Sequence, residues 1–266
     1  MRVEELLARL GIDGPAVAVA RQGVSAHAWV AGGAIVKLAR EGCADDIARE
    51  VIAGPAARAA GVRTPALVAS SHGDGEAWCV WERVDGEPLA EGADAARWRE
   101  VGRELARLHT IDRCDDPRGV LHTHDKRDAR PHLHALSPER AAWLARWLDR
   151  LERVPAGPRR LLHYDVHGLN VLCPTAGATL IDWGDSAWGD PASDLGSIPI
   201  HLIPHVLDGY EERASLGPDA EARILRTVIG HAVRKFAERG RRKPLDDLVA
   251  FVERGVPERW RRWIDQ

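Results

Sequence analysis

The sequence predicts an α+β fold with two lobes: a five-stranded antiparallel sheet with a helix, followed by a mainly helical C-terminal lobe. Two observations lead to this prediction. Short β-prone runs broken by glycines fill the first third of the chain, whereas after Gly86 apolar residues recur at the three-to-four spacing of amphipathic helices. The 266 residues suffice for two lobes with substantial cores. We expect the lobes to be residues 1–85 and 86–266, joined by a hinge near 82–88.

The N-terminal lobe should begin with a helix over residues 2–10, which has leucines on one face. A second helix is expected over 44–53, because Asp45 and Asp46 occupy the first turn, where the helix dipole favours acids. Gly54-Pro55 should interrupt this helix, with a short continuation to Ala60. Strands are expected over 17–20, 26–30, 34–39, 66–70 and 77–82, with Gly32-Gly33 as a hairpin turn.

The C-terminal lobe should contain helices over 95–110 and 138–152, where apolar residues recur at helical spacing. A polar stretch over 160–185 is flanked by short apolar runs and predicts two brief strands that carry loops. Residues 201–266 are expected to be helical again. We find no internal repeat and no linker long enough to separate independent domains.

Composition and charge exclude several classes of protein. Hydrophobic residues make up 45% and charged residues 29%, an ordinary globular balance. The formal net charge of -3 argues against a nucleic-acid binder, which needs a strongly basic surface. No apolar run approaches the roughly 18–20 residues that cross a bilayer, and the charged first ten residues do not read as a signal peptide. The scattered cysteines, Cys43, Cys79, Cys114 and Cys173, favour a reduced, cytoplasmic protein. We expect a monomer or a homodimer.

One polar constellation carries a specific chemistry. His163, Asp165 and Asn170 form the pattern HxDxxxxN, and twelve residues later Asp182 follows an isoleucine and precedes Trp183-Gly184. Asp, Asn and Gly are common in ordinary turns, so a lone HxD means little. Here all the elements occur in order at matching spacing. This segment resembles the catalytic and metal loops of protein kinases.

Neighbouring residues narrow the resemblance. His167 follows Asp165 by two residues, and a later segment, Gly189-Asp190-Pro191-Ala-Ser-Asp194, is similar to the aminoglycoside phosphotransferase and choline kinase branch. That branch lacks the activation segment of protein kinases, and so does this chain. The resemblance implies a protein-kinase-like fold and transfer of the γ-phosphate of ATP or GTP, bound with Mg²⁺, to a hydroxylated small molecule.

The resemblance also implies roles for the loop residues. Phosphoryl transfer needs a positioned nucleophile and neutralised phosphate charge. Asp165 would orient the acceptor hydroxyl or take its proton, while Asn170 and Asp182 would offer Mg²⁺ the hard oxygen ligands that it prefers. Loop support is assigned to His163, to His167 as a packing residue, to Asp190 as the cap of a helix that begins at Pro191, and to Asp194 as an acceptor of hydrogen bonds from the catalytic loop.

The N-terminal lobe should then hold the nucleotide. Lys37 lies among apolar residues in AIVKLA, as the family's third-strand lysine does, and Glu50 in the next helix matches its acidic partner, with Glu41 and Asp46 as rivals. By the same resemblance, Glu82 and Val84 would contact the purine through their backbone, and Gly23 and Ser25 would contact phosphates. The first hairpin has no GxGxxG, which argues against a protein kinase more than against a kinase.

The acceptor is less specified. Between His231 and Gln266, ten Lys or Arg residues outnumber six Asp or Glu residues, which weakens the case for a strongly cationic acceptor. Asp185, His201 and His205 are the expected acceptor contacts. The histidines at 122, 124, 132 and 134 lack the partners of a zinc site.

Three functions remain open at this stage. The first hypothesis is a kinase that phosphorylates a hydroxylated antibiotic and thereby gives resistance. The alternative is a metabolic kinase for choline, homoserine, a ketosamine or a sugar. A non-catalytic nucleotide-binding pseudokinase is less favoured, because Lys37, Asp165, Asn170 and Asp182 are all retained.

Overall fold

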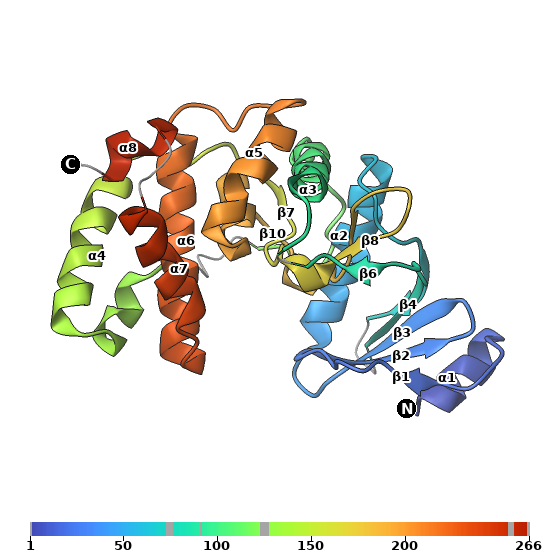
Figure 1. Ribbon diagram of the computed structural model, residues 1–266. Helices are drawn as coiled ribbons and strands as arrows, with labels where there is room; N and C mark the ends of the chain where they lie inside the picture. The colour runs from blue at the N-terminus through green and yellow to red at the C-terminus, as the bar shows by residue number, and fades with distance from the viewer. Residues whose placement is uncertain (1, 73–76, 91, 123–127, 255–257, 265–266) are drawn as a thin grey trace.

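The computed structural model describes residues 2–72, 77–90, 92–122, 128–254 and 258–264. It confirms the α+β prediction: a sheet with its helices forms one end of the molecule and a helical part forms the other (Figure 1). Within the described ranges, no helix is long and apolar enough to cross a membrane. The lobe boundary between residues 85 and 86 stays a prediction.

The N-terminal sheet has five antiparallel strands in the order β1-β2-β3-β5-β4. Their bounds are β1 Val17–Ala18, β2 Ala26–Ala31, β3 Ala34–Ala39, β4 Leu67–Ser71 and β5 Trp78–Glu82. β1 is shorter than predicted. β3 lies at the centre, so that Lys37 pairs with Cys79 of β5 on one side and Ala28 of β2 on the other. The central strand therefore supplies the cation of the predicted site.

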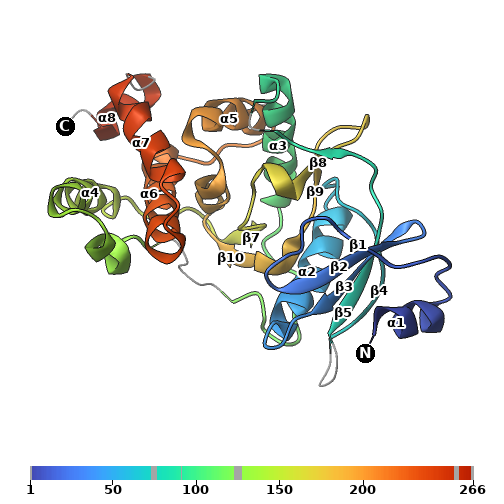
Figure 2. The same cartoon turned by 60° about the horizontal axis from the view of Figure 1, so that its bottom comes forward.

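Two helices cover the two faces of this sheet (Figures 1 and 2). α1, Val3–Leu10, packs Leu6 and Leu7 against Val36 and Val80. α2, Ala44–Ala59, covers the opposite face, where Ile47 and Val51 meet Cys79 and Trp81. The cation and the catalytic loops lie on the α2 side.

The predicted break at Gly54-Pro55 is wrong, because α2 continues through both residues. Tertiary packing overrides the local preference of proline. A side chain at 54 would come within 2.6 Å of Trp81 and 3.3 Å of Trp183. Gly54 therefore lets the helix lie directly against two buried indoles, and this contact outweighs the hydrogen bond that Pro55 cannot donate.

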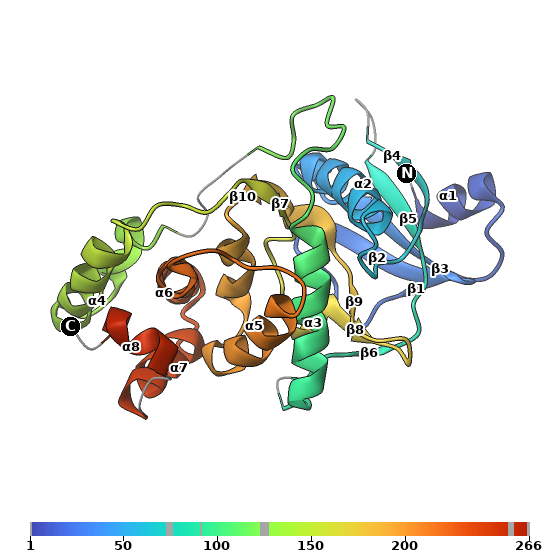
Figure 3. The same cartoon turned by 90° about the horizontal axis from the view of Figure 1, so that it is seen from above.

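The C-terminal part is built on two crossed helices, α3, Ala95–Leu108, and α5, Ile203–Glu211. Gly102 and Gly209 lie at their crossing, where a Cβ on either would overlap the partner's backbone. The remaining helices are α4 Pro138–Leu151, α6 Ala220–Arg239, α7 Lys243–Glu253 and α8 Glu258–Ile264, and they gather on the far side of α5 from α3 (Figure 3). One large apolar core joins these helices to the loop-bearing segment.

The loop-bearing segment contains four short strands, where only two were predicted. β7, Arg160–Leu162, pairs with β10, Ala187–Gly189, while β8, Val171–Cys173, lies between β9, Thr179–Leu180, and β6, Glu87–Pro88. The additional strand pairs join segments that are distant in the sequence, so local alternation of apolar and polar residues could not predict them. The element after Asp190 is a 3₁₀ helix, Pro191–Ser197; other 3₁₀ turns cover Arg130–Ala135, Gly168–Asn170, Trp183–Asp185 and Ile200–Leu202.

The helix crossing gives a stability prediction. Gly102→Ala should lower the free energy of unfolding by about 3 kcal/mol, because the new methyl group must displace the backbone of α5. Gly92→Ala is the matched control, since nothing lies within 4 Å of a Cβ there. Chemical denaturation of both variants measures the difference. Equal midpoints for the two variants would contradict close packing at this crossing.

Candidate active site

A cleft of about 1600 Å³ lies between the sheet and the helical part. Its lining includes the 21–26 turn, β3, the 82–90 connection, the 164–172 and 181–185 loops, and the 231–247 region. These segments are far apart in the chain, but the fold brings them around one space. The residues singled out in the sequence can therefore be located relative to this cleft.

Lys37 joins three elements at the cleft. Its Nζ lies 2.7 Å from Glu50 Oε1 on α2 and 2.9 Å from Asp182 Oδ1 on the 181–185 loop. Burial of the ammonium lowers the pKa of Lys37, but the carboxylates of Asp182 and Glu50 outweigh it and the net shift is upward. The same ammonium holds the pKa of Asp182 below its usual value. Glu50 is 5% exposed, and burial raises its pKa despite Lys37.

The rivals of Glu50 lie elsewhere. Asp46 forms an ion pair with Arg49, whose Nε also donates to the backbone oxygen of Gly184 at 2.7 Å. Glu41 is exposed at the start of the connection to α2. Sequence reasoning missed Arg49, which fastens α2 to the loop that carries Asp182.

Asp165 lies on the 163–170 loop with two polar neighbours. Asn170 Nδ2 donates to the Asp165 backbone oxygen at 3.0 Å and to Oδ2 at 3.2 Å. His167 Nε2 lies 3.3 Å from the same Oδ2, while its Nδ1 accepts from the backbone N–H of Leu169. This assigns the ring proton to Nε2, directed at Asp165. His167 therefore contacts the carboxylate and does more than pack the loop.

The electrostatics keep Asp165 ionised. Burial raises the pKa of its carboxyl, but the hydrogen bond from His167 and the nearby His163 and Lys235 outweigh burial and hold the pKa well below its usual range. A carboxylate of this kind is a weak ground-state base. It is suited to orienting a hydroxyl and to taking its proton late in the reaction.

A buried carboxylate supports the backbone of this loop. Asp194 accepts from the backbone N–H of His163 at 3.0 Å and of Tyr164 at 2.5 Å. Its Oδ2 also lies 3.0 Å from Nε2 of His109, whose Nδ1 lies 3.1 Å from the hydroxyl of Tyr210. Tyr164 has a φ of +67°, a conformation that costs energy for a non-glycine residue. The two bonds to Asp194 stabilise that conformation.

Two further residues hold the loops together. His163 Nε2 lies 2.9 Å from the Ile181 backbone oxygen and ties the catalytic loop to the segment that carries Asp182. The backbone of Asp182 has a φ of +69°, which is a strained conformation for a non-glycine residue and changes the direction of its side chain. Asp190 accepts from the Ala192 backbone N–H as the predicted cap and also pairs with buried Arg223 at 2.7 Å. Arg223 was not singled out from the sequence.

Most of the other predicted residues line the cleft, and two do not. Gly23, Ser25, Glu82, Val84 and Asp185 all contribute to its lining. His201 and His205 do not line it, which corrects their assignment as acceptor contacts. They follow the loop segment closely in sequence, but the 3₁₀ turn at 200–202 carries the chain into α5.

Sequence reasoning missed a basic side of this cleft. The lining from α6 and the start of α7 comprises Arg234, Lys235, Arg239, Arg241, Arg242 and Lys243, together with His231 and Asp247. The excess of basic residues after His231 was the available signal. Those charges could not be assigned to the cleft without the fold, because a charged helix face points to solvent by default.

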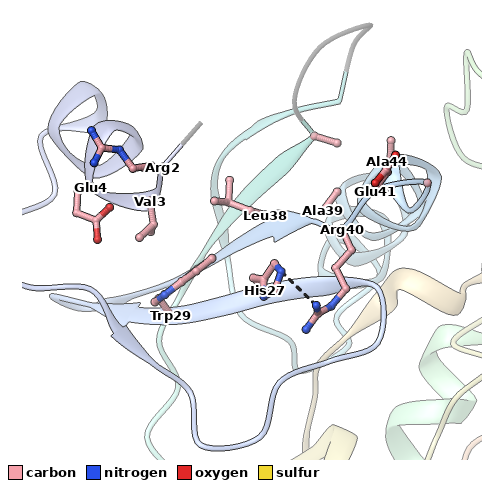
Figure 4. Close-up of a pocket in the computed structure, with 12 residues that line it drawn as sticks. Arg2, Val3, Glu4, His27, Trp29, Leu38, Ala39, Arg40, Glu41 and Ala44 are labelled. Atoms are coloured by element: carbon pink, nitrogen blue, oxygen red, sulfur yellow. Dashed lines mark hydrogen bonds between the residues drawn. The ribbon is translucent and has the colours of Figure 1, made fainter.

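The remaining histidines are only partly covered by the described residues. His132 and His134 lie on the 130–135 turn, His122 precedes it, and His124 lies outside the described residues. No group of three His, Cys, Asp or Glu side chains within the described part of the chain could hold a metal ion. A second pocket, of about 600 Å³, lies between α1 and the sheet near Trp29 and Arg40, away from the catalytic loops (Figure 4).

The oxygen donors in the cleft suit one hard cation better than a transition metal. The Asn170 amide nitrogen is committed to Asp165, so its Oδ1 is the atom left for a ligand. Asp182 is half exposed and has one carboxylate oxygen against Lys37. Amide and carboxylate oxygens with phosphate oxygens are the typical environment of Mg²⁺. The residues present therefore fit a magnesium–triphosphate site.

Comparisons with known proteins agree with this geometry. The model of the phosphotransferase enzyme family, APH, matches residues 17–225. Similar solved structures are aminoglycoside phosphotransferase APH(4)-Ia, at 17% identity and a TM-score of 0.67 over 96% of this chain and 99% of that one, and a choline/ethanolamine kinase family protein from Mesorhizobium loti, at 18% identity and 0.66 over 99% and 94%.

A third is macrolide 2'-phosphotransferase MphH from Brachybacterium faecium, at 19% identity and a TM-score of 0.64 over 96% of this chain and 98% of that one. No curated protein sequence matches the chain significantly. At these identities the structures establish the fold alone, whereas the family model spans most of the sequence. The chain belongs to the phosphotransferase enzyme family and is an ATP-dependent phosphotransferase that acts on an alcohol group.

Proposed function

We propose that this protein, in the cytoplasm, uses Mg²⁺ to move the γ-phosphate of ATP to a hydroxyl of a small-molecule acceptor, namely a hydroxylated antibiotic. The observation that carries the proposal is the convergence of Lys37, Asp165, Asn170 and Asp182 on one cleft. Solved structures similar to this fold include antibiotic kinases, for example a macrolide 2'-phosphotransferase. The same proposal includes GTP as an alternative phosphate donor. It also includes a monomer or a homodimer as the active form.

The proposed reaction assigns one task to each residue. Lys37, held by Glu50, binds the α- and β-phosphates, and Asn170 and Asp182 bind the metal. When bound, Mg²⁺ neutralises charge on the β- and γ-phosphates. Asp165 hydrogen-bonds the acceptor hydroxyl and takes its proton as the new O–P bond forms and the bond to the leaving β-phosphate oxygen breaks. ADP and a phosphate ester are the products.

A metabolic acceptor is the second candidate, and one observation favours it. Six Lys or Arg side chains line the helical side of the cleft, which suits a neutral or anionic acceptor better than a polycationic one. Acidic residues would be expected there for an aminoglycoside, since opposite charges attract across the cleft. Homoserine, a ketosamine or a sugar would meet this condition better than choline, which is a cation.

The first prediction concerns Asp165. Asp165→Asn should keep the fold and nucleotide affinity but reduce kcat by about 10³-fold, because an amide cannot take the acceptor's proton. Turnover and nucleotide binding are measured on the same preparation. Asp208→Asn is the control, since Asp208 is exposed on α5 and does not line the cleft. Unchanged kcat in Asp165→Asn would remove this residue from the mechanism.

The second prediction concerns Asp182 and the metal. Calorimetry should find that wild-type protein binds ATP more tightly with Mg²⁺ than with EDTA. In Asp182→Asn that advantage should shrink about tenfold, because an uncharged ligand holds the cation less well. A metal dependence identical to wild type would show that Asp182 is not a ligand.

The acceptor is tested directly by turnover. Purified protein with Mg²⁺ and either ATP or GTP is offered hydroxylated antibiotics and, in parallel, homoserine, choline, ketosamines and sugars. Release of ADP or GDP that depends on one acceptor, with a phosphate ester detected by mass spectrometry, identifies the class. Turnover confined to metabolites would contradict the antibiotic assignment and support the second candidate.

A further inference from the structure

The helical side of the cleft carries an unbalanced charge. Between 231 and 247 its lining includes Arg234, Lys235, Arg239, Arg241, Arg242 and Lys243, and its one carboxylate is Asp247. These side chains come from the last turns of α6, from the turn that follows and from the first residue of α7. By contrast, exposed Arg130 is paired, with Asp149 and Glu152.

Four of these cations form no ion pair with a described residue, and we name them the basic cluster: Lys235, Arg239, Arg241 and Arg242. Arg234 lies 3.7 Å from Glu238 and Lys243 lies 3.6 Å from Asp247, whereas no ion pair with any described residue is formed by the four. Burial lowers the pKa of Lys235, and Arg239, Arg234 and Arg241 lower it further against the opposing effect of Asp165. Uncompensated like charges destabilise a fold, which indicates a role in binding.

The basic cluster lies on the acceptor side of the cleft. The predicted nucleotide contacts come from the sheet and the 82–84 connection, whereas α6 and α7 lie across the cleft from the sheet (Figure 1). Lys235 is close enough to Asp165 for each to shift the pKa of the other. A molecule whose hydroxyl contacts Asp165 therefore has the basic cluster beside its remaining groups.

We propose that the acceptor carries, besides the hydroxyl that is phosphorylated, a carboxylate or phosphate group bound by Lys235, Arg239, Arg241 and Arg242. The inference rests on the proposed function, because it names the acceptor of the same site. Arginine is suited to this task, since its planar guanidinium binds carboxylate and phosphate through two parallel hydrogen bonds. Such a group offsets part of the cluster's positive charge and fixes the hydroxyl against Asp165.

Anion binding tests the proposal without knowledge of the acceptor. The full-length protein is saturated with Mg²⁺ and a non-hydrolysable ATP analogue, and inorganic phosphate and succinate are titrated separately at constant ionic strength. At least one anion should bind, measured by calorimetry and by a rise in Tm. The anion that binds more tightly distinguishes a phosphate from a carboxylate. In the double variant Arg241→Gln/Arg242→Gln its Kd should rise about tenfold or more, the effect of losing charge-assisted hydrogen bonds.

Arg254→Gln is the matched control, because Arg254 is exposed at the end of α7 and does not line the cleft. It should bind the anion as wild type does. The double variant should unfold at the same Tm as wild type or higher when no anion is present, since like charges have been removed. A lower Tm would assign these arginines to folding and overturn the proposal.

Other outcomes of the anion-binding and turnover experiments would also support or overturn the inference. Absence of binding to the nucleotide-saturated protein, or equal Kd values in the double variant and wild type, would overturn the inference. Anion binding that occurs only without nucleotide would assign the cluster to the triphosphate. In the turnover assay, the preferred acceptor should carry an acidic group, and a preference for a polycationic aminoglycoside would also refute it. The proposed function fails separately, if the turnover assay finds no hydroxylated acceptor that the protein phosphorylates with ATP or GTP.

Discussion

The contact between Lys37 and two carboxylates is the interaction on which the site depends. It connects the central strand of the sheet, through Glu50, to α2 and, through Asp182, to the loop that carries the predicted metal ligand. A buried ammonium is costly unless it is paired, so the fold is stable only when these three segments meet. Once they meet, the ammonium and the half-exposed Asp182 carboxylate face the same cleft. The arrangement that satisfies a buried charge also prepares a phosphate site.

A second buried charge, the carboxylate of Asp194, stabilises the 163–170 loop, as the ion pairs of Lys37 stabilise the segments around the sheet. Asp194 receives two backbone N–H groups and a histidine, so the strained backbone at Tyr164 is supported by the core that α3 and α5 form. Burial raises the pKa of Asp194, but His109 and the loop donors outweigh burial and lower it overall. The carboxylate therefore stays ionised at neutral pH. The close packing of α3 on α5 therefore supports the backbone beside Asp165 through the contacts of Asp194.

Local patterns were sufficient to predict the strands of the five-stranded sheet and the positions of both N-terminal helices, because each depends on nearby sequence, whereas the roles of the loop residues stay predictions. The predicted helix break at Pro55 was wrong because the effect of this proline on α2 depends on Trp81 and Trp183, which are distant in the chain. The supports of the site were missed for the same reason: His109 lies 85 residues from Asp194. A lone buried histidine carries no periodic or motif signal. Long-range pairs between residues of common type can be read only from the folded chain.

The basic helical side of the cleft gives a physical basis on which a shared fold could select its acceptor. In the proposed mechanism, Asp165, Asn170 and Asp182 serve phosphoryl transfer to any hydroxyl, so these three residues do not indicate which molecule is phosphorylated. The last turn of α6 is free of that constraint, and there the cleft carries cations such as Lys235 and Arg239. In the proposed function, these cations would attract an anionic acceptor that approaches from this side while Asp165 binds its hydroxyl. We therefore expect acceptor choice to depend on α6 and α7, outside the segments proposed to perform the chemistry.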